Sequence, residues 1–544
     1  MCGFAYLYVF PYQSRINNPN ENVRLYMTAA IVEEGRYAID GMRKRWGWVN
    51  DAAVFGGHVY SVKAPGTSLL GVPAYAAYLQ ATHLLGRPFD RTEGLWLCRV
   101  FASILPTLVW LFFFHRWLAR RSESPALCDA VFVSVALGSL LYGYALMFAS
   151  HTTSAAAAFG AFMLLYDARE ARACSARRAF GAGLLVASVT LFEYPGLVAS
   201  VVLTVYAAFA LRRPTRLVAF AAGGLGPTLA VMHFQWRAFG NPFMPGHLFV
   251  ESAALRAAHH EGLYGAVGPS AAALHGLTLH PGAGLFPLTP ILAFAAIGFV
   301  LLWGTRARRA DAACALALVV LTLLAIASMN NWRGGWTIGP RYLAVVVPFL
   351  GWGALVGLEA IARRSEGHAL ALATGCTAAA LVASGLPSAY FPHFPPEVAR
   401  PLPDVVWLLV GHGYAPPNAG AFAGVYGTPS MLPLFAALLA ALATCLAATA
   451  GWRARAVRAA GAAALTAVLL APLHVRTGDP ARIAQARAFI TEHWTPAGHD
   501  AAARLVADLR ARGVLADADL RRLAALYAEE GRLREAARAR AGRL

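Results

Sequence analysis

The sequence predicts a polytopic all-α membrane protein. Of its 544 residues, 58% are hydrophobic and 14% are charged, and the mean hydropathy is +0.52. Soluble domains carry about 25% charged residues. Apolar blocks of about 17–25 residues recur along most of the chain, each long enough to cross the hydrocarbon core as a helix. Arginine clusters separate many of these blocks. Together, the three observations predict about 12–13 transmembrane helices.

The arginine clusters predict which loops face the cytoplasm. They lie near residues 116–121, 169–178, 212–216, 306–309, 363–364 and 453–458. Basic residues are enriched in cytoplasmic loops, so we expect these loops to set the topology and to have no other role. This distribution accounts for the net charge of +18 without nucleic-acid binding, and we expect no nucleic-acid partner.

The spans are predicted from the apolar blocks, in order along the chain. They lie near residues 95–118, 127–147, 152–167, 179–192, 196–211, 217–234, 286–304, 311–329, 342–362, 368–386, 430–450 and 459–474. If the sides alternate, the outer face receives residues 148–151, 192–196, 235–285, 330–341 and 387–429. We therefore expect a membrane domain over residues 1–474.

The two ends of the chain need separate interpretation. Residues 1–12 are apolar but too short to span the membrane, and we expect the chain to start inside a first transmembrane helix. A first outer loop then covers about 13–94. Residues 67–86 are predicted to form an interfacial or re-entrant helix in it, because span 95–118 must run inward from the outer face. Residues 475–544 alternate charge with apolar positions at helical spacing, which predicts a small soluble helical tail.

Polar residues that are unusual in a membrane protein gather in the predicted outer segments. They are Glu21 and Arg24 in "NENVR", Asp40, Asp51, Lys63 in "VKAPG", His151 in "FASHTTSA", Glu193 and Tyr194 in "FEYPG", and Arg333 and Arg341 in "NNWRGGWTIGPRYL". Taken singly, each has an ordinary explanation. Glu21 can stabilise a helix N-terminus, Lys63 can snorkel, and the arginines beside tryptophans can anchor at the interface. A carboxylate such as Glu193 between two spans is costly unless it is partnered or functional.

In their order along the chain, these motifs resemble the integral-membrane glycosyltransferases of the GT-C superfamily. The match is to bacterial relatives of dolichyl-phosphate-mannose protein mannosyltransferases and of the lipid A aminoarabinose transferase, and it covers roughly residues 1–365. The resemblance implies a sugar carried on a polyprenyl phosphate and an acceptor hydroxyl on the outer face. The acceptor can be a lipid, a glycan or a protein.

The resemblance also implies roles for single residues. An acidic residue of the first loop acts as base in the family, often within Asp-Glu-x-Arg, and Glu21 has the matching spacing to Arg24. Asp40 and Asp51 remain rivals for this role. Lys63 falls on the family's Lys-x-Pro motif, but Val62 replaces the acidic residue that often precedes that lysine. This replacement weakens a metal or second-acid role for the loop. We expect no cofactor; a divalent metal stays open as an alternative that the sequence does not indicate.

The chemistry of the reaction gives Lys63 a purpose. The chain has 46 lysines and arginines together, and only Lys44 and Lys63 are lysines. Breaking a bond between sugar and phosphate leaves a phosphate with growing negative charge, which a fixed cation at low dielectric stabilises. A hydroxyl acceptor also needs a base, here a first-loop carboxylate. One displacement would invert the anomeric carbon.

We therefore expect an inverting glycosyltransferase of the inner (plasma) membrane, with its site facing the periplasm or exterior. The candidate base is Glu21 or Asp40, and the candidate substrate-binding residues are Arg24, Asp51, Lys63, His151, Glu193, Tyr194, Arg333 and Arg341. The alternatives are a multi-span transporter or lipid flippase, and an oligomerising envelope scaffold. A transporter predicts an inverted repeat and charges near the middle of spans. The sequence shows no clear repeat, and its charges gather at one edge.

Overall fold

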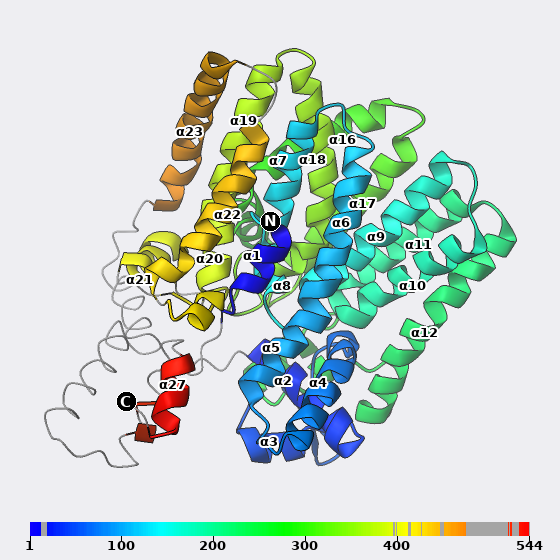
Figure 1. Ribbon diagram of the computed structural model, residues 1–544. Helices are drawn as coiled ribbons and strands as arrows, with labels where there is room; N and C mark the ends of the chain where they lie inside the picture. Colours follow the sequence, from blue (N-terminus) through cyan, green and yellow to red (C-terminus); the bar gives the residue numbers. More distant parts are fainter. Residues whose placement is uncertain are drawn as a thin grey trace, which may run out of the picture.

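A computed structural model of the chain describes residues 1–11, 19–394, 398, 400–411, 415–425, 427–446, 451–474, 520–521, 523–524 and 533–542. These residues form a bundle of long helices with a smaller layer at one end of it (Figure 1). The all-α membrane fold predicted from composition is confirmed. Most of the predicted tail lies outside the described residues, which include one helix there, α27 (Leu533–Arg540).

Helices from most of the chain build the bundle. They are α1 (Cys2–Tyr8), α6 (Leu105–Ala119), α7 (Pro125–Ala136), α8 (Leu140–Ala145), α9 (His151–Glu170), α10 (Ala176–Phe192), α11 (Leu197–Leu211), α12 (Pro214–Phe239), α15 (Leu285–Leu288), α16 (Ala295–Gly304), α17 (Arg309–Ala327), α18 (Val347–Ala362), α19 (Glu366–Ala380), α20 (Leu386–Tyr390), α21 (Trp407–Gly411), α22 (Thr428–Leu446) and α23 (Trp452–His474). Two further helices, α13 (Ala253–His260) and α14 (Ala271–Thr278), lie in the connection between α12 and α15.

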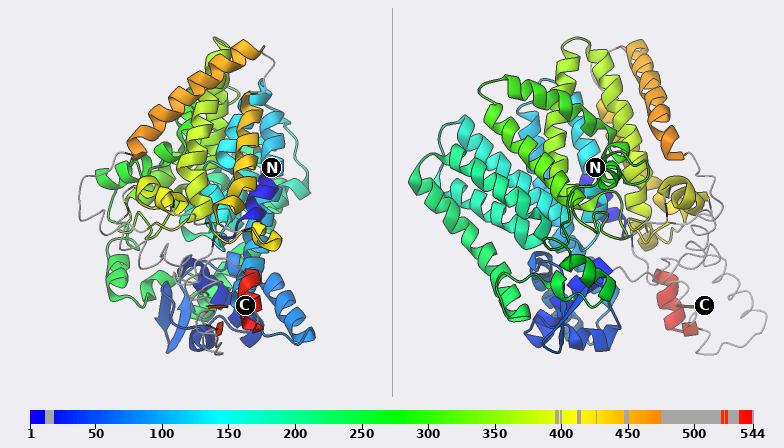
Figure 2. Two further views of the ribbon diagram at one scale, coloured as in Figure 1. Left: turned by 60° about the vertical axis from the view of Figure 1, so that its left-hand side comes forward. Right: turned by 180° about the vertical axis from the view of Figure 1, so that it is seen from behind.

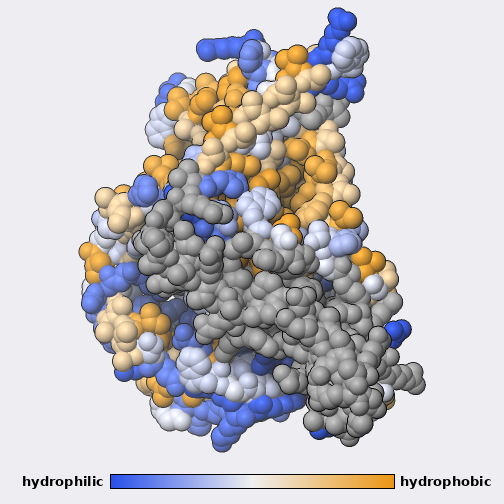
Figure 3. Space-filling view, turned by 90° about the vertical axis from the view of Figure 1, so that its left-hand side faces the viewer, coloured by the Kyte–Doolittle hydropathy of each residue, from blue (hydrophilic) through white to orange (hydrophobic). Residues whose placement is uncertain are grey.

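Eight helical segments among the described residues are long and apolar enough to cross a membrane. They are Arg91–Ala119, Tyr194–Leu211, Pro214–Phe239, Arg309–Ala327, Arg341–Ala362, Glu366–Tyr390, Thr428–Cys445 and Trp452–His474. Of the other predicted spans, 127–147 is divided into α7 and α8, because Ser139 caps a new helix by accepting a hydrogen bond from the Leu141 amide at 3.2 Å. Hydrophobic residues gather over the upper part of the molecule, with hydrophilic ones at its top (Figure 3).

The first outer loop folds into the layer at one end of the bundle. Its elements are α2 (Pro19–Glu34), α3 (Asp40–Trp46), β1 (Ala52–Phe55), β2 (His58–Ser61), α4 (Gly66–Leu84) and α5 (Arg91–Arg99). A core of its own includes Tyr26 and Tyr75, together with Phe234 and Phe239 from the end of α12. We call this unit the first-loop layer. The lower end of α12 reaches it, while α10 and α11 stand above it (Figures 1 and 2).

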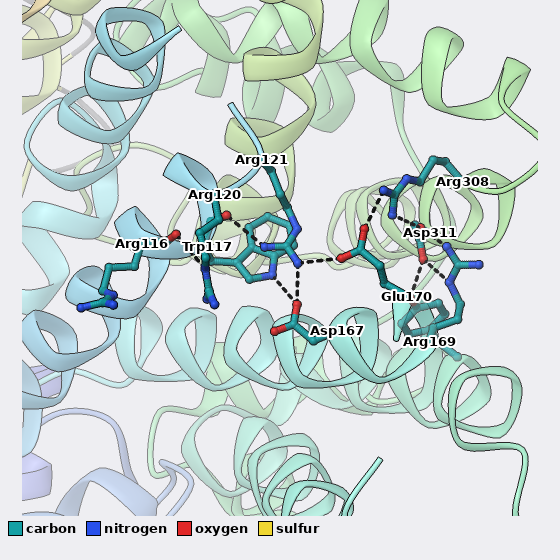
Figure 4. Close-up of polar contacts among 10 residues, drawn as sticks. Arg116, Trp117, Arg120, Arg121, Asp167, Arg169, Glu170, Arg308 and Asp311 are labelled. Carbon is teal, nitrogen blue, oxygen red and sulfur yellow. Dashed lines mark hydrogen bonds and ion pairs between the residues drawn. The ribbon is translucent and has the colours of Figure 1, made fainter. Parts of the chain in front are cut away.

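The arginine loops at the opposite end have a structural role that we did not expect. Their arginines pair with carboxylates of neighbouring helices: Arg121 with Asp167 (2.7 Å) and Glu170 (3.1 Å), Arg308 with Glu170 (2.7 Å), and Arg169 with Asp311 (Figure 4). Asp311 is fully buried and also accepts a hydrogen bond from the Tyr206 hydroxyl at 2.5 Å. The expectation that these loops only set the topology is therefore wrong, because their charges also join α6, α9, α11 and α17.

Candidate functional site

A β-hairpin in the first-loop layer brings Asp51 and Lys63 together. Strands β1 and β2 pair antiparallel with Ala52 opposite Ser61, and the Val62 amide donates to the Asp51 carbonyl at 3.1 Å. The two residues at the open end of the hairpin therefore meet, with Lys63 Nζ 3.0 Å from Asp51 Oδ2. The turn is Gly56-Gly57, both with positive φ (59° and 80°), as a two-residue type I′ hairpin requires.

Asp51 sits in a strained backbone conformation. Its φ is 60°, which is uncommon for a residue other than glycine, and such strain concentrates at functional sites. The Asn50 Oδ1 atom accepts a hydrogen bond from the Asp51 amide at 2.8 Å. Burial raises the pKa of Asp51, but the Lys63 and Arg341 cations outweigh burial, so that the pKa is lower than usual. Asp51 is therefore a carboxylate at neutral pH.

A second polar cluster forms where α10 meets α11. Glu193 Oε2 lies 3.1 Å from Nδ1 of His151 and accepts a hydrogen bond from the Ser150 hydroxyl. Arg24, on α2, donates to Ser150 Oγ at 2.8 Å and to Asn20 at 2.6–2.7 Å. His151 is the first residue of α9, so the cluster joins the first-loop layer to the bundle. The cost of burying Glu193 is offset by these partners.

The loop before α18 presents Arg341. Arg341 is 7% exposed, and its one hydrogen bond to a described residue runs from Nη2 to the Tyr342 hydroxyl at 3.1 Å. Among the residues that the structure describes, no carboxylate lies within 4.0 Å of its guanidinium. Gly334, at φ 77°, passes so close that a Cβ there would lie 2.7 Å from Arg341 Nε. The "RGGWTIGPR" motif thus packs backbone against a buried cation that has no carboxylate within 4.0 Å in the described part of the chain.

These groups line one cavity of about 1480 Å³. Its polar end is lined by Asn20, Asn50, Asp51, Lys63, His151, Glu193, Tyr194, Gln235, His247, His259 and Arg341. Its other end, which we call the apolar limb, is lined from α10, α11 and α12 by Val186, Ala187, Leu197, Val198, Val201, Val205, Phe220, Ala221, Leu225, Val231 and Met232. A chamber of this kind suits a ligand with an anionic head and a hydrocarbon tail.

Two histidines at the polar end were not identified from the sequence. The ring of His247 lies 5.3 Å from that of His259 and 5.8 Å from that of Tyr194, centroid to centroid. Burial, Lys63 and His259 lower the pKa of His247 to about 3, so the ring is neutral at physiological pH. In the sequence, His247 is a single histidine within "NPFMPGHLF", and nothing in that stretch distinguishes it from a histidine without a functional role.

Glu21 lies outside the cavity lining. Its carboxylate accepts hydrogen bonds at 2.6 Å from Nε and Nη2 of Arg99 and from the Phe148 amide. Glu21 and Arg99 are 2% and 1% exposed. Burial raises the pKa of Glu21, but Arg99 outweighs it and the net pKa is below its usual value. Its partners thus join α2 to α5 within the first-loop layer and to the segment before α9 in the bundle, and Glu21 does not line the cavity that holds the Asp51–Lys63 pair.

The remaining predicted residues also lie outside the cavity lining. Asp40 begins α3, where it accepts from the Val59 amide at 3.1 Å and lies 3.2 Å from His58 Nδ1. Arg24 does not line the cavity itself, but it donates a hydrogen bond to Ser150, which in turn donates to the lining residue Glu193. Arg333 is in the same loop as Arg341 but does not line the cavity. Among the described residues, no three His, Cys, Asp or Glu side chains group as a metal site.

Comparison with known proteins gives distant likenesses only. No protein-family model matches the chain, and no curated protein matches it in sequence. The structure of ArnT from Cupriavidus metallidurans in the apo state aligns over 87% of this chain and 75% of its own, with 18% identity and a TM-score of 0.46. The undecaprenyl phosphate-bound ArnT aligns over the same shares, with 16% identity and a TM-score of 0.45.

The archaeal oligosaccharyltransferase AglB from Archaeoglobus fulgidus, in complex with an inhibitory peptide and a dolichol-phosphate, is similar over 73% of this chain and 55% of its own. Its identity is 13% and its TM-score 0.39. ArnT and AglB are both GT-C glycosyltransferases, the superfamily that the sequence resembles. With TM-scores under 0.5, we derive neither an activity nor a site from these likenesses.

Proposed function

We propose that the cavity transfers a sugar from a polyprenyl phosphate to an acceptor hydroxyl, with Asp51 as the base. The observation that carries the proposal is the placement of an Asp51–Lys63 pair, 3.0 Å apart, and of Arg341 at the polar end of a mostly apolar cavity. Asp51 acts on Arg341 only from beyond 4.0 Å, and no described carboxylate forms a direct ion pair with it. An anionic ligand that lies against Arg341 would supply that direct partner.

The donor's phosphodiester would lie against Arg341 and Lys63. Lys63 neutralises Asp51 in the structure, so an arriving phosphate competes for the ammonium. As the phosphate draws Lys63 away and adds negative charge nearby, the pKa of Asp51 rises from its lowered value. Donor binding thus converts a paired, weakly basic carboxylate into a better base. Because His247 is neutral, the positive charge that the cavity lining offers to the phosphate comes from Lys63 and Arg341.

The transfer itself is a single displacement. The acceptor hydroxyl gives its proton to Asp51 while its oxygen bonds to the anomeric carbon. The bond from that carbon to the phosphate oxygen breaks, and the electron pair leaves with the polyprenyl phosphate. Lys63 and Arg341 stabilise the charge that grows on the leaving phosphate. Attack opposite the leaving group inverts the anomeric carbon.

Location and acceptor follow from the same proposal. The cavity opens among segments that we predict to face outward, and the arginine loops lie at the far end of the bundle. The reaction would therefore occur at the outer face of the inner (plasma) membrane. The acceptor, a lipid, glycan or protein, would approach through the first-loop layer, and the carrier lipid from the bilayer side.

The test is a comparison of Asp51→Asn with Asp40→Asn. Purified protein in nanodiscs is supplied with a radiolabelled polyprenyl-phosphate sugar and an envelope fraction as acceptor source, and the label that leaves the carrier is measured. We expect wild-type protein and Asp40→Asn to transfer label and Asp51→Asn to lose roughly 10²–10⁴-fold in rate, the usual contribution of a general base. Equal rates in the two variants would remove Asp51 from the mechanism.

A further inference from the structure

The apolar limb of the cavity has a closed end. At that end α10 and α12 touch backbone to backbone: a Cβ on Gly183 would lie 1.8 Å from the Phe220 carbonyl oxygen, and one on Gly223 would lie 2.0 Å from that of Phe180. Gly183 and Phe220 themselves line the cavity. A chain that enters from the polar end therefore meets a wall here and cannot continue between these two helices.

The length of the limb follows from its lining residues. On α10 it runs from Thr190 to Gly183 and on α11 from Leu197 to Val205, which at 1.5 Å per residue is about 10–12 Å. Along α12 the lining extends from Gln235 to Phe220, about 22 Å by the same rise. Each five-carbon isoprene unit adds four carbons to the main chain, which at ordinary bond lengths extend about 5 Å. The limb thus holds about two to four units.

The chemistry of the limb suits hydrocarbon. Its hydroxyls already have protein partners. Thr204 donates to the Ser200 carbonyl at 2.8 Å and Thr228 to that of Gly224 at 2.9 Å. The Ser200 hydroxyl donates to the Val186 carbonyl at 2.8 Å and lies 3.0 Å from that of Thr190. The side of α11 that faces it is open: Leu197, Val201 and Val205 are 55%, 54% and 55% exposed. A longer chain can therefore leave the limb sideways along α11 into the bilayer.

We propose that the limb recognises about the first two to four isoprene units of the carrier and none beyond them. This inference rests on the proposed function. Units inside the limb contact shaped protein walls, so each adds to affinity. Units beyond it lie in lipid both before and after binding, and lipid tails are as apolar as protein side chains. Affinity should therefore rise with chain length and then reach a plateau.

The experiment measures binding of sugar-free polyprenyl phosphates to the full chain in nanodiscs. Dimethylallyl phosphate (one unit), geranylgeranyl phosphate (four units) and undecaprenyl phosphate (eleven units) compete against a labelled polyprenyl phosphate, with concentrations expressed per bilayer lipid so that partitioning cancels. We expect geranylgeranyl phosphate to bind at least about tenfold more tightly than dimethylallyl phosphate, and undecaprenyl phosphate to match geranylgeranyl phosphate within about threefold. A continued steep rise up to undecaprenyl phosphate, or equal binding of all three, would overturn the inference and leave the proposed function standing.

Two matched variants locate the effect. Val201→Trp fills the limb about 6 Å beyond Leu197, while Val218→Trp makes the same change on α12 at a site that is 68% exposed and outside the cavity lining. We expect Val201→Trp to bind dimethylallyl and geranylgeranyl phosphate equally, and Val218→Trp to behave as wild type. If Val201→Trp does not fold, Val205→Trp, nearer the closed end, takes its place. If a folded Val201→Trp or Val205→Trp variant keeps the wild-type preference for longer chains, the inference is contradicted. If no polyprenyl phosphate binds the wild-type protein, the proposed function is contradicted as well.

Discussion

Replacing Glu21 with Gln should destabilise the protein rather than remove a catalytic group. Glu21 and Arg99 are almost fully buried and share two hydrogen bonds of 2.6 Å. Glu21→Gln keeps a hydrogen-bond acceptor for the Phe148 amide but leaves the Arg99 guanidinium buried without its counter-charge. Removing one partner of such a pair typically costs about 3–5 kcal/mol. We expect a loss in this range.

A double-mutant cycle isolates this term. Glu21→Gln, Arg99→Gln and the double variant are unfolded in detergent, and the free energies of unfolding are compared with wild type. The double variant has no unpaired buried charge from this pair. We therefore expect it to lose less stability than the sum of the two single losses, by a coupling energy of about 1–3 kcal/mol. Residual transfer activity, normalised to folded protein, should stay within about tenfold of wild type. A Glu21→Gln variant with wild-type stability and no transfer would refute this reasoning and restore Glu21 as the base.

Three further predictions concern the cavity, the hairpin and pH. Arg341→Gln should weaken donor binding by about tenfold or more, the loss of a hydrogen bond to a charged group. It should not lower thermal stability, since the variant breaks no ion pair within 4.0 Å among the described residues. Arg333→Gln is the control, and a stability loss confined to Arg341→Gln with normal donor binding would contradict the prediction. Gly57→Ala should lower the free energy of unfolding by about 1 kcal/mol or more, because the φ of Gly57 is 80°. It should also lower turnover, because a distorted turn displaces Asp51 relative to Lys63. The control is Gly304→Ala, where an added Cβ would have no other atom within 4 Å, and we expect neither effect there. Because the pKa of Glu21 is lowered in the folded protein, the carboxylate stabilises the fold fully above its ordinary pKa of 4.5, and this stabilisation is lost as the pH falls below that value. Below about pH 4.5, the melting temperature of the wild-type protein should therefore drop more steeply than that of Glu21→Gln. Parallel curves for the two proteins would argue against the ion pair.

Hydropathy and arginine placement were sufficient for the fold class, because the physics of a helix in lipid depends on local composition alone. The same reasoning grouped the polar residues of the outer segments, and Asp51, Lys63, His151, Glu193 and Arg341 do line one cavity. Which residue pairs with which was not predictable. Glu21 meets Arg99, 78 positions away, through the packing of α2 against α5, and nothing in "NENVR" indicates that partner.

The hairpin was a signal that could have been used. Gly56-Gly57 between "AAVF" and "HVYS" is the pattern of a two-residue β-turn between short strands. Reading that pattern would have placed Asp51 opposite Val62, and therefore next to Lys63, and would have favoured Asp51 over Glu21 as the carboxylate beside the lysine. The expectation of helices alone in this loop prevented that inference. The roles of all these site residues stay predictions until they are measured.

We propose that the cavity breaks a bond between sugar and carrier phosphate, rather than moving the carrier across the bilayer. Sealed proteoliposomes that contain the protein and a radiolabelled polyprenyl-phosphate sugar, with an envelope acceptor fraction outside, distinguish the two. We predict that the label becomes covalently attached to the acceptor, with an equal amount of free polyprenyl phosphate formed, and that both products disappear with Asp51→Asn. Label that crosses the bilayer still attached to its polyprenyl phosphate would contradict the account.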